Sequence, residues 1–410
     1  MSWFTSFGIG GASAIALTIA GAVISESVLS NHIVASEQEI TQPETPPAEV
    51  VELLVPLARW PAAVSPQDDL LWGSEAIARS RLLTAIDHSL RYLDTPAGMD
   101  AYEDYLVEGI TRDRVRRSLI RFRALLVLSQ SPTNFYEAVQ REFVLYQSVG
   151  QDGEGTVHFT GYFEPSFQAS RVPTEEYRYP LYQRPADLDT WELPHPTRRV
   201  LEGMNGTQGD QGPLKGLELV WLRDRLEAFL VQVQGSARLQ LTDGTFMSVG
   251  YAGRTEYPYT SIGRELINDG KIPEAELTLD RLLAHFQDHP EELDDYLPRN
   301  NRFVFFRETA GGPPTGTFSF PVTAERSIAT DKALMPPGAI ALITLDWPPA
   351  DPTSPLPAQP ISRYVLNQDT GGAIKGPGRV DIFVGSGDAA GQQAGQINTD
   401  GHLYYLLLPR

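Results

Sequence analysis

The segment that most constrains the fold lies near the C-terminal end of the chain, between Asp369 and Asp381. Its sequence, DTGGAIKGPGRVD, separates two carboxylates with four glycines and one lysine. Runs typical of strands lie beside each acid, at 364–366 and 380–384. Because glycine tolerates positive φ and lets a ligand approach the backbone, we expect a strand, a turn and a strand that hold both acids at the rim of a groove. The same spacing also fits a plain hairpin with solvated aspartates, because turns favour Asp and Gly.

The composition limits the class of protein. The chain has 410 residues, 41% of them hydrophobic, which is enough for two globular domains and a terminal extension. It carries 33 Lys and Arg against 52 Asp and Glu, a net charge of −19. Nucleic acid is therefore not an expected partner, because affinity for it comes largely from clustered cations, whereas neutral glycans are compatible with this charge. The absence of cysteine excludes disulfides, thiolate chemistry and cysteine-ligated zinc.

The first 50 residues are expected to lie outside the folded part. Residues 8–25 carry no charge and the first basic residue is Arg59, so this stretch indicates a signal-peptide core or a membrane anchor. A buried helix is the alternative interpretation. Residues 35–49 are rich in Glu, Gln, Thr and Pro, as in an extended linker. A signal peptide and an anchor both predict export from the cytoplasm, and an anchor would add membrane association through the N-terminal segment.

The next segments predict a helical region followed by a strand. Residues 73–150 have apolar positions at the three- and four-residue spacing of helices. At 157–165 the pattern changes to a strand that ends in a turn, where Thr160, Tyr162 and Glu164 offer polar groups beside Gly161. These groups suit sugar binding, but an aromatic pair in the core with a surface acid is the competing interpretation.

The second half of the chain is rich in predicted strands. Residues 217–222, 228–236, 237–241 and 246–251 suggest a small sheet or barrel, with a hairpin at TDGT, residues 242–245. Alternation in the second of these strands would put Gln232 and Gln234 on one face, which ends at Gly235 and Ser236. Helices are expected at 262–270 and 277–288, and further strands at 301–308 and 339–347. Many short strands near the C-terminus suggest a closed β-barrel.

Several segments together resemble the membrane-bound lytic transglycosylase A (MltA) family. They are TGYFEP at 160–165, AFLVQVQGS at 228–236, VGYAG at 249–253, PYTSIGR at 258–264, FVFFRE at 303–308 and DTGGAIKG at 369–376. The C-terminal part resembles a three-aspartate (3D) domain, which is a double-psi β-barrel, and Asp331, Asp369 and Asp381 fall at the positions of its three acids. The chain differs from the family's lipoproteins in having no anchoring cysteine.

The resemblance implies a mainly β fold with an N-terminal helical region. In this fold a double-psi β-barrel is split in the chain by an inserted second β-domain, and a groove lies between the two. The expected division is a signal or anchor with a linker at 1–50, the helical region and first part of the barrel at 51–165, the inserted domain at 166–309 and the three-aspartate part at 310–410.

The resemblance also implies an enzyme, a lytic transglycosylase that binds peptidoglycan glycan strands. It would cleave the β-1,4 bond between N-acetylmuramic acid and N-acetylglucosamine and leave 1,6-anhydromuramyl ends. The family's acid maps onto Asp381, with Asp369 beside it. One carboxylate that donates and then retrieves a proton is sufficient for this reaction, so we expect no metal ion or other cofactor. The residues expected to contact the glycan are Thr160, Gly161, Tyr162, Glu164, Gln234, Gly235, Ser236, Asp331 and Lys375.

Two other functions remain open at this point. A non-catalytic protein that binds cell-wall glycans is one, because double-psi barrels also occur as binding modules, and an ionised, solvated Asp381 would favour it. A true glycosidase is the other, with Glu164 as the second carboxylate that hydrolysis requires.

Overall fold

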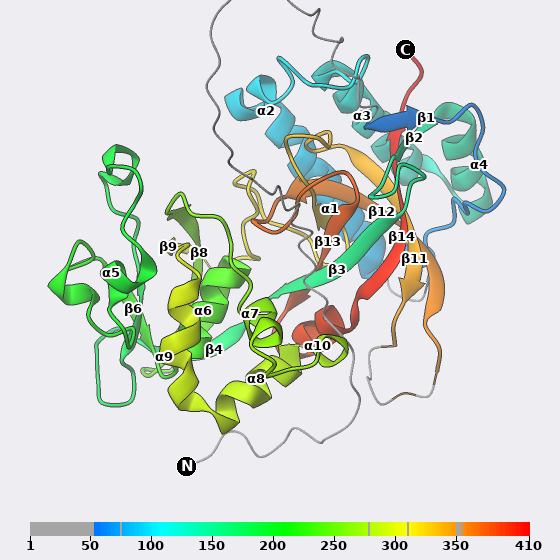
Figure 1. Ribbon diagram of the computed structural model, residues 1–410. Helices are drawn as coiled ribbons and strands as arrows, with labels where there is room; N and C mark the ends of the chain where they lie inside the picture. Colours follow the sequence, from blue (N-terminus) through cyan, green and yellow to red (C-terminus); the bar gives the residue numbers. More distant parts are fainter. Residues whose placement is uncertain (1–52, 74–75, 278, 310, 350–353, 355) are drawn as a thin grey trace, which may run out of the picture.

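The structure is a computed structural model that describes residues 53–73, 76–277, 279–309, 311–349, 354 and 356–410. The predicted signal or anchor at 8–25 and the linker at 35–49 lie outside the described residues. Within the described part, no helix is both long and apolar enough to cross a membrane. The chain forms two lobes, one built mainly from residues before 165 and after 310 and the other from the residues between (Figure 1).

The larger lobe contains a closed β-barrel. Among the described residues its sheet has eight strands in the order β1-β2-β14-β11-β12-β10-β13-β3, and an additional pairing of β14 with β3 closes the ring. Two pairs, β10–β12 and β13–β3, are parallel, and the other pairs are antiparallel. The strands are β1 (Leu54–Pro56), β2 (Val144–Ser148), β3 (Val157–Glu164), β10 (Ser327–Ala329), β11 (Ile340–Trp347), β12 (Gln359–Asp369), β13 (Arg379–Ser386) and β14 (Asn398–Leu407).

The glycine-rich segment does not close a hairpin. Strands β12 and β13, which flank it, do not pair with each other, because β10 lies between them. Ala329 of β10 is the register partner of Asp369 on one side and of Asp381 on the other. The segment therefore crosses over β10. The strands expected on either side of it are present, whereas the alternative of a plain hairpin is wrong. The two acids are brought together by a third strand about 40 positions before the first of them.

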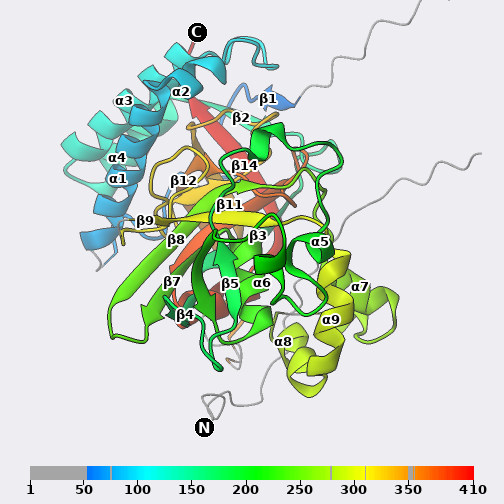
Figure 2. The same ribbon diagram turned by 90° about the vertical axis from the view of Figure 1, so that its left-hand side faces the viewer.

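A layer of helices covers the barrel, as the spacing in 73–150 predicts. It consists of α1 (Ala76–Leu93), α2 (Pro96–Asp100), α3 (Arg112–Leu128) and α4 (Pro132–Glu142). Side-chain oxygens of Thr111 and Ser131 cap the first turns of α3 and α4, which explains where these helices begin. Figure 2 shows the helical layer along one side of the barrel lobe. The buried face of α3 packs against the barrel, where Phe122 meets Tyr364 of β12 edge to face at 4.9 Å between ring centroids.

The inserted lobe has its own sheet and its own cores. The sheet order is β5-β6-β4-β7-β8-β9, and helices cover it on one side (Figures 1 and 2). Its strands are β4 (Ser166–Ser170), β5 (Tyr179–Tyr182), β6 (Glu218–Leu222), β7 (Ser236–Leu241), β8 (Phe246–Arg254) and β9 (Val304–Thr309). Its α-helices are α5 (Arg198–Glu202), α6 (Arg225–Gln234), α7 (Ile262–Asn268), α8 (Leu279–Asp288) and α9 (Leu293–Tyr296). Short 3₁₀ helices lie at Leu188–Thr190, Gly209–Gln211, Glu274–Glu276, Pro290–Glu292 and Leu297–Arg299, and α10 (Asp388–Gln396) belongs to the barrel lobe.

Residues 228–234 belong to helix α6 and not to the strand predicted at 228–236. Asp224 caps the helix by accepting from the backbone N–H groups of Leu226 and Glu227, and Gly235 ends it in the left-handed conformation with φ 80°. Gln232 is buried, whereas Gln234 is half-buried near the C-terminal end. The two glutamines therefore do not share a sheet face. The alternation of Val and Gln over four residues was too short to separate a strand from a helix.

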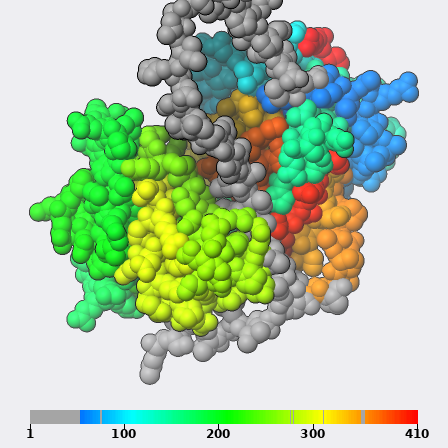
Figure 3. Space-filling model, viewed as in Figure 1, coloured from blue at the N-terminus to red at the C-terminus, as the bar shows by residue number. Residues whose placement is uncertain are grey.

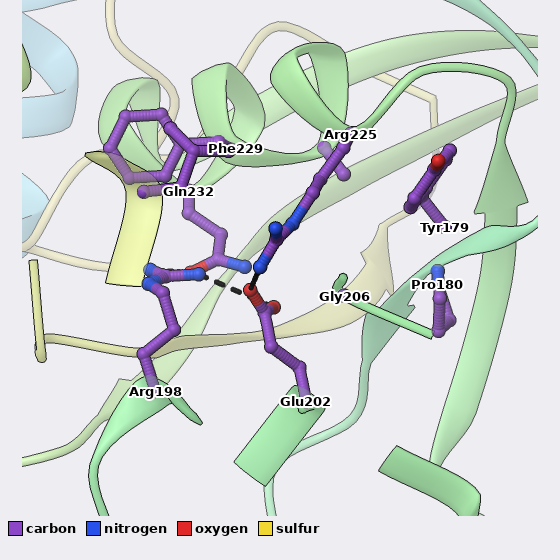
Figure 4. A pocket seen from close by; sticks show the side chains of 10 residues that line it. Tyr179, Pro180, Arg198, Glu202, Gly206, Arg225, Phe229 and Gln232 are labelled. Atoms are coloured by element: carbon purple, nitrogen blue, oxygen red, sulfur yellow. Dashed lines mark hydrogen bonds and ion pairs between the residues drawn. The ribbon is translucent and has the colours of Figure 1, made fainter. Parts of the chain in front are cut away.

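A buried ionic network holds α5 and α6 together under the sheet of the inserted lobe (Figure 4). Glu202 accepts from Arg225 Nη2 at 3.0 Å and from Arg198 Nη1 at 3.4 Å. Arg198 also donates to Gln232 Oε1 at 2.7 Å. The small cavity between these side chains is lined by charged groups that bind one another, so we assign it to the stability of this lobe.

Candidate active site

Asp381 is the third residue of β13, between β10 and β3 in the barrel. Its register partner on β3 is Thr160, whose Oγ1 donates to Asp381 Oδ1 at 2.7 Å. Arg379, two positions earlier on the same strand, donates from Nη2 to Thr160 Oγ1 at 2.8 Å. The carboxyl group of Asp381 is thus held by a two-step chain of hydrogen bonds, from Arg379 through Thr160 to one of its oxygens.

The surroundings of Asp381 favour its protonated form. Burial raises the pKa of its carboxyl group above the ordinary value for aspartate. The positive charge of Arg379 and the hydrogen bond from Thr160 oppose this effect, as His158 does more weakly, whereas the negative charge of Asp369 adds to it. A carboxyl group with a raised pKa can carry a proton closer to neutral pH, which is what a general acid requires.

Asp369 is surrounded by donors. Its Oδ1 accepts from Thr317 N at 2.9 Å, Thr317 Oγ1 at 2.7 Å and Thr370 N at 2.9 Å. Its Oδ2 accepts from Tyr162 Oη at 2.8 Å. Because every one of these groups is a donor, the contacts suit an acceptor-only carboxylate. Asp369 therefore has the geometry of a group that orders the loop around it.

The two acids are neighbours without touching. Each lies beside Ala329, one on either side, so their Cα atoms are separated by two strand spacings, about 10 Å. Tyr162 bridges this gap, because its hydroxyl binds Asp369 while its ring packs against Phe383 of β13 at 5.2 Å between centroids. Burial raises the pKa of Tyr162 well above its ordinary value, and both aspartates contribute to that rise.

Glu164 lies at the far end of β3 from Asp381. Its register partner is Ser386, whose Oγ donates to Glu164 Oε2 at 2.6 Å, and its side chain is 1% exposed. Burial raises its pKa, opposed by Ser386 and by Arg238. It follows Thr160 by four positions in the strand, a distance of about 13 Å along β3. Glu164 is therefore not a surface acid, and it does not share a site with Asp381.

Gly161 packs against a helix. A Cβ at this position would lie 2.8 Å from Ala394 Cα and 2.9 Å from Ala394 O, in α10. The absence of a side chain thus lets β3 and α10 come into contact. This packing explains why a glycine stands beside Thr160 and Tyr162.

Asp331 and Lys375 lie on the glycine-rich side of the barrel. Asp331 is buried and follows β10, and its Oδ2 accepts from Gly376 N at 3.0 Å. Lys375 has a side chain that is 71% exposed, and its Nζ lies 3.8 Å from Asp331 Oδ1. Asp331 therefore ties the end of the segment 370–376 to the strand β10, while Lys375 remains available at the surface.

Gln234, Gly235 and Ser236 lie where α6 ends and β7 begins. Both α6 and β7 contact β3, and Arg238 N donates to Pro165 O at 2.9 Å, so this corner adjoins the point where the chain leaves the barrel. Ser236 is buried and the other two are half-buried. The corner belongs to the inserted lobe. It is formed at the C-terminal end of helix α6, whereas the pattern predicted the end of a strand.

Three residues of the site were not singled out from the sequence. Arg379 could have been found, because it stands two positions before Asp381 in a strand and so points to the same side. Ser386 is separated from Asp381 by a register shift between Phe383 and Gly385, which hides its alignment with Glu164. Thr317 gives no signal, since it lies in a loop far from Asp369 in sequence.

The described residues offer no evident metal centre. Within them, no three His, Asp or Glu side chains gather closely enough to hold a metal ion. The side chains around Asp381 are a hydroxyl, a guanidinium and an aromatic ring, which position a carboxyl group and suit proton transfer.

These features define a class: a β-barrel protein, split in the chain by an inserted β-lobe, with a partly buried carboxyl group in the barrel that is oriented by a threonine and an arginine. Figure 3 shows the two lobes side by side on one face, with the inserted lobe on the left. The MltA-specific insert domain model matches residues 158–307, and the 3D domain model matches residues 326–407.

The chain belongs to the MltA family. It is 30% identical over 290 residues to the membrane-bound lytic murein transglycosylase A of Escherichia coli K12, covering 67% of this chain and 76% of that protein. The crystal structure of a membrane-bound lytic murein transglycosylase from Agrobacterium tumefaciens superimposes with a TM-score of 0.67 at 28% identity, covering 84% of this chain and 96% of that one. The crystal structure of E. coli MltA with bound chitohexaose gives a TM-score of 0.65 at 25% identity, covering 87% and 95%. The predicted fold, a split barrel with an inserted β-domain, is confirmed.

Proposed function

We propose that this protein is a peptidoglycan lytic transglycosylase in which Asp381 acts first as general acid and then as general base. The observation that carries the proposal is the environment of Asp381, a carboxyl group whose pKa is raised by burial and whose orientation is set by Thr160. The named relatives, which are lytic murein transglycosylases, support the choice of reaction.

Protonated Asp381 would give its proton to the glycosidic oxygen as the bond to C1 of N-acetylmuramic acid breaks. The C6 hydroxyl of the same sugar then attacks C1, and the Asp381 carboxylate takes the hydroxyl proton. The products are a 1,6-anhydromuramyl end and a strand that begins with N-acetylglucosamine, and the carboxyl group is restored. A single carboxyl group serves both steps, so the reaction needs no second acid and no water.

The position of Glu164 argues against a hydrolase. Hydrolytic glycosidases place two carboxyl groups about 5–5.5 Å apart when they retain configuration and about 6.5–9.5 Å apart when they invert it. Glu164 lies about 13 Å along β3 from Thr160, the register partner of Asp381, and its Oε2 accepts a hydrogen bond from Ser386 Oγ. Asp369 is nearer, but its oxygens are already engaged by four donors.

The other residues receive supporting roles. We assign Thr160 and Arg379 to the orientation of Asp381, and Asp369 to the order of the loop beside it. We assign contact with the glycan to Tyr162, Lys375 and the corner formed by Gln234, Gly235 and Ser236. We assign a structural role to Gly161, Asp331 and Glu164, which hold the neighbouring strands and loop in place. The fold and these assignments fit a division of the chain at 1–50, 51–165, 166–309 and 310–410.

We place the protein in the cell envelope, acting on glycan strands. One relative of known structure holds a chitohexaose, which is a β-1,4-linked chain of N-acetylglucosamine, and several relatives carry the name membrane-bound. The uncharged stretch at 8–25 supports a periplasmic location with attachment or export through the N-terminal segment.

Analysis of the products of digested peptidoglycan tests the proposal. The purified protein is incubated with peptidoglycan, and the soluble fragments are separated by mass. Anhydromuramyl ends are expected. Reducing ends would instead indicate a hydrolase, and binding without any release of fragments would indicate the alternative function, a non-catalytic protein that binds cell-wall glycans.

A further inference from the structure

An arginine of the inserted lobe reaches the glycine-rich segment of the barrel. Arg302 precedes β9, and its Nε donates to Tyr257 O at 2.9 Å, which fixes the base of the guanidinium. A Cβ at Gly372 would clash with Arg302 Nη1 and lie 2.9 Å from its Cζ. The guanidinium therefore rests directly on the backbone of the segment 370–376, across from the lobe that carries it.

This guanidinium lacks a counter-ion in the part of the chain that the structure describes. None of the ion pairs among the described residues includes Arg302, although the chain has an excess of 19 acidic charges. Its Nε is engaged by Tyr257, while the two Nη atoms, which carry the paired donors suited to a carboxylate, have no hydrogen-bond partner among the described residues. Glu256 is near enough to act on Arg302 electrostatically, but it forms no ion pair with it, so the paired Nη donors can bind a carboxylate of a ligand.

The neighbours of Arg302 add positive charge and an aromatic surface. Burial lowers the pKa of Arg302, and the nearby cation Arg254 lowers it further. Tyr251, which is 43% exposed, lies close enough to both cations for them to pull its pKa down against the effect of burial. The ion pair of Arg254 with Glu256 is long, at 3.9 Å, and Arg254 Nη1 also donates to Thr255 O at 3.3 Å and to Tyr257 O at 3.5 Å. The patch formed by Tyr251, Arg254 and Arg302 is therefore cationic and partly shielded from water.

The patch lies beside the loop that adjoins the proposed catalytic acid. Gly372 follows Asp369 by three positions, so an extended chain would separate them by at most about 11 Å. The Cα atoms of Asp369 and Asp381 are in turn about 10 Å apart. In peptidoglycan, the sugar whose bond is cleaved carries a lactyl group and a short peptide with free carboxylates. These carboxylates lie within a similar reach of the scissile bond, and the sugars themselves are uncharged.

We propose that Arg302, flanked by Arg254 and Tyr251, binds a carboxylate of the peptide carried by the N-acetylmuramic acid at the cleavage site. The site would make the enzyme select glycan strands that still bear acidic peptides. This inference rests on the proposed function. It adds a residue that determines substrate choice and is separate from the catalytic carboxyl group of Asp381.

The test compares three substrates of matched length: strands with native peptides, the same strands with their carboxylates converted to amides, and strands from which an amidase has removed the peptides. For the wild-type protein we expect kcat/KM to be roughly ten-fold higher for native than for amidated strands, the value of one charge-assisted hydrogen-bonded contact. For Arg302→Gln we expect this ratio to fall to near one.

Two further variants make the result specific. Arg302→Lys retains the charge but not the paired donors, so it should give an intermediate ratio, and it serves if the glutamine variant does not fold. Arg199→Gln removes an exposed arginine of α5 in the same lobe and should keep the wild-type ratio.

The outcomes separate this inference from the proposed function. Anhydromuramyl products with equal rates on native and amidated strands would overturn the inference alone. An unchanged ratio in both Arg302 variants would do the same. A wild-type protein that releases no anhydromuramyl ends would overturn the proposed function and this inference with it.

Discussion

Replacing Asp381 with Asn preserves the size of the side chain and removes its proton chemistry. Thr160 Oγ1 can still donate to the amide oxygen, so the fold and glycan binding should change little. Cleavage should fall by about 10²–10⁴-fold, the usual contribution of general acid–base catalysis. Release of anhydromuramyl fragments from peptidoglycan measures the rate. A variant that keeps more than about a tenth of the activity would reject Asp381 as the acid.

Asp369→Asn and Arg379→Gln should move the pH profile in opposite directions. Activity requires protonated Asp381, so it falls as the pH rises through the pKa of that group. Loss of the negative charge of Asp369 lowers this pKa and shifts the falling limb to lower pH, whereas loss of the positive charge of Arg379 raises it and shifts the limb to higher pH.

The control for this pair is Arg379→Lys, which retains the charge. Profiles of kcat/KM against pH for the three variants decide the question. Asp369 also accepts four hydrogen bonds, so Asp369→Asn should lower the melting temperature as well. A lower melting temperature with an unmoved limb would show that Asp369 acts only on the loop.

Individual residues of the site were predictable only as far as the local pattern extended. Asp369, Asp381 and Thr160 stand in segments whose strand character is visible, and the structure brings them together. Three of the four hydrogen bonds to Asp369, those from Thr317 and Tyr162, and the burial that raises the pKa of Asp381 come from segments far away in sequence. Only packing reveals them.

At the scale of elements, the contact between β3 and α10 depends on Gly161. Gly161→Ala would place a methyl group 2.8 Å from Ala394 Cα and 2.9 Å from its carbonyl oxygen, so one of the two elements has to shift. Overpacking of this kind costs about 1–3 kcal/mol of unfolding free energy, and a displaced β3 would also move Thr160 away from Asp381. Urea unfolding and kcat/KM measure the two effects.

Gly312→Ala is the matched control, because a Cβ at Gly312 meets no atom within 4 Å. It should leave the unfolding free energy within about 0.5 kcal/mol of the wild type, as is usual for surface substitutions. Equal stability of Gly161→Ala and Gly312→Ala would contradict the packing role of Gly161, and would return it to the residues that contact the glycan.

The elements also show where periodicity misled the prediction. The strands β6, β7 and β8, the helical layer and α7 lie where their patterns indicated. Helix α6 lies where a strand was predicted. The alternating Val and Gln residues resemble a strand, and the helix start signal at Asp224 precedes them by several residues. The alternative of a plain hairpin at 369–381 is wrong for a different reason, since strand order is set by tertiary packing and β10 enters from elsewhere in the chain.

At the scale of the whole molecule, the first part of the described chain is tied to the barrel by one buried ion pair. Asp68 binds Arg326 through both Nη atoms and accepts from the backbone N–H groups of Leu70, Leu71 and Tyr364. Both side chains are fully shielded from solvent. The segment from Leu54, where β1 pairs with β2, is therefore part of the folded unit.

Removal of residues 1–50 should consequently give a soluble protein that cleaves peptidoglycan at the wild-type rate, because every contact described above lies after this point.

In the same truncated chain, Asp68→Ala should lower the free energy of unfolding by about 3–5 kcal/mol, since Arg326 is left as an uncompensated buried charge. Asp113→Ala is the control, because its pair with Arg117 lies on the exposed face of α3 and contributes at most about 1 kcal/mol. Urea unfolding of the three proteins provides the comparison. A truncated chain that fails to fold would show that the removed segment packs against the lobes, and an Asp68→Ala variant as stable as the control would mean that Arg326 finds another partner or water.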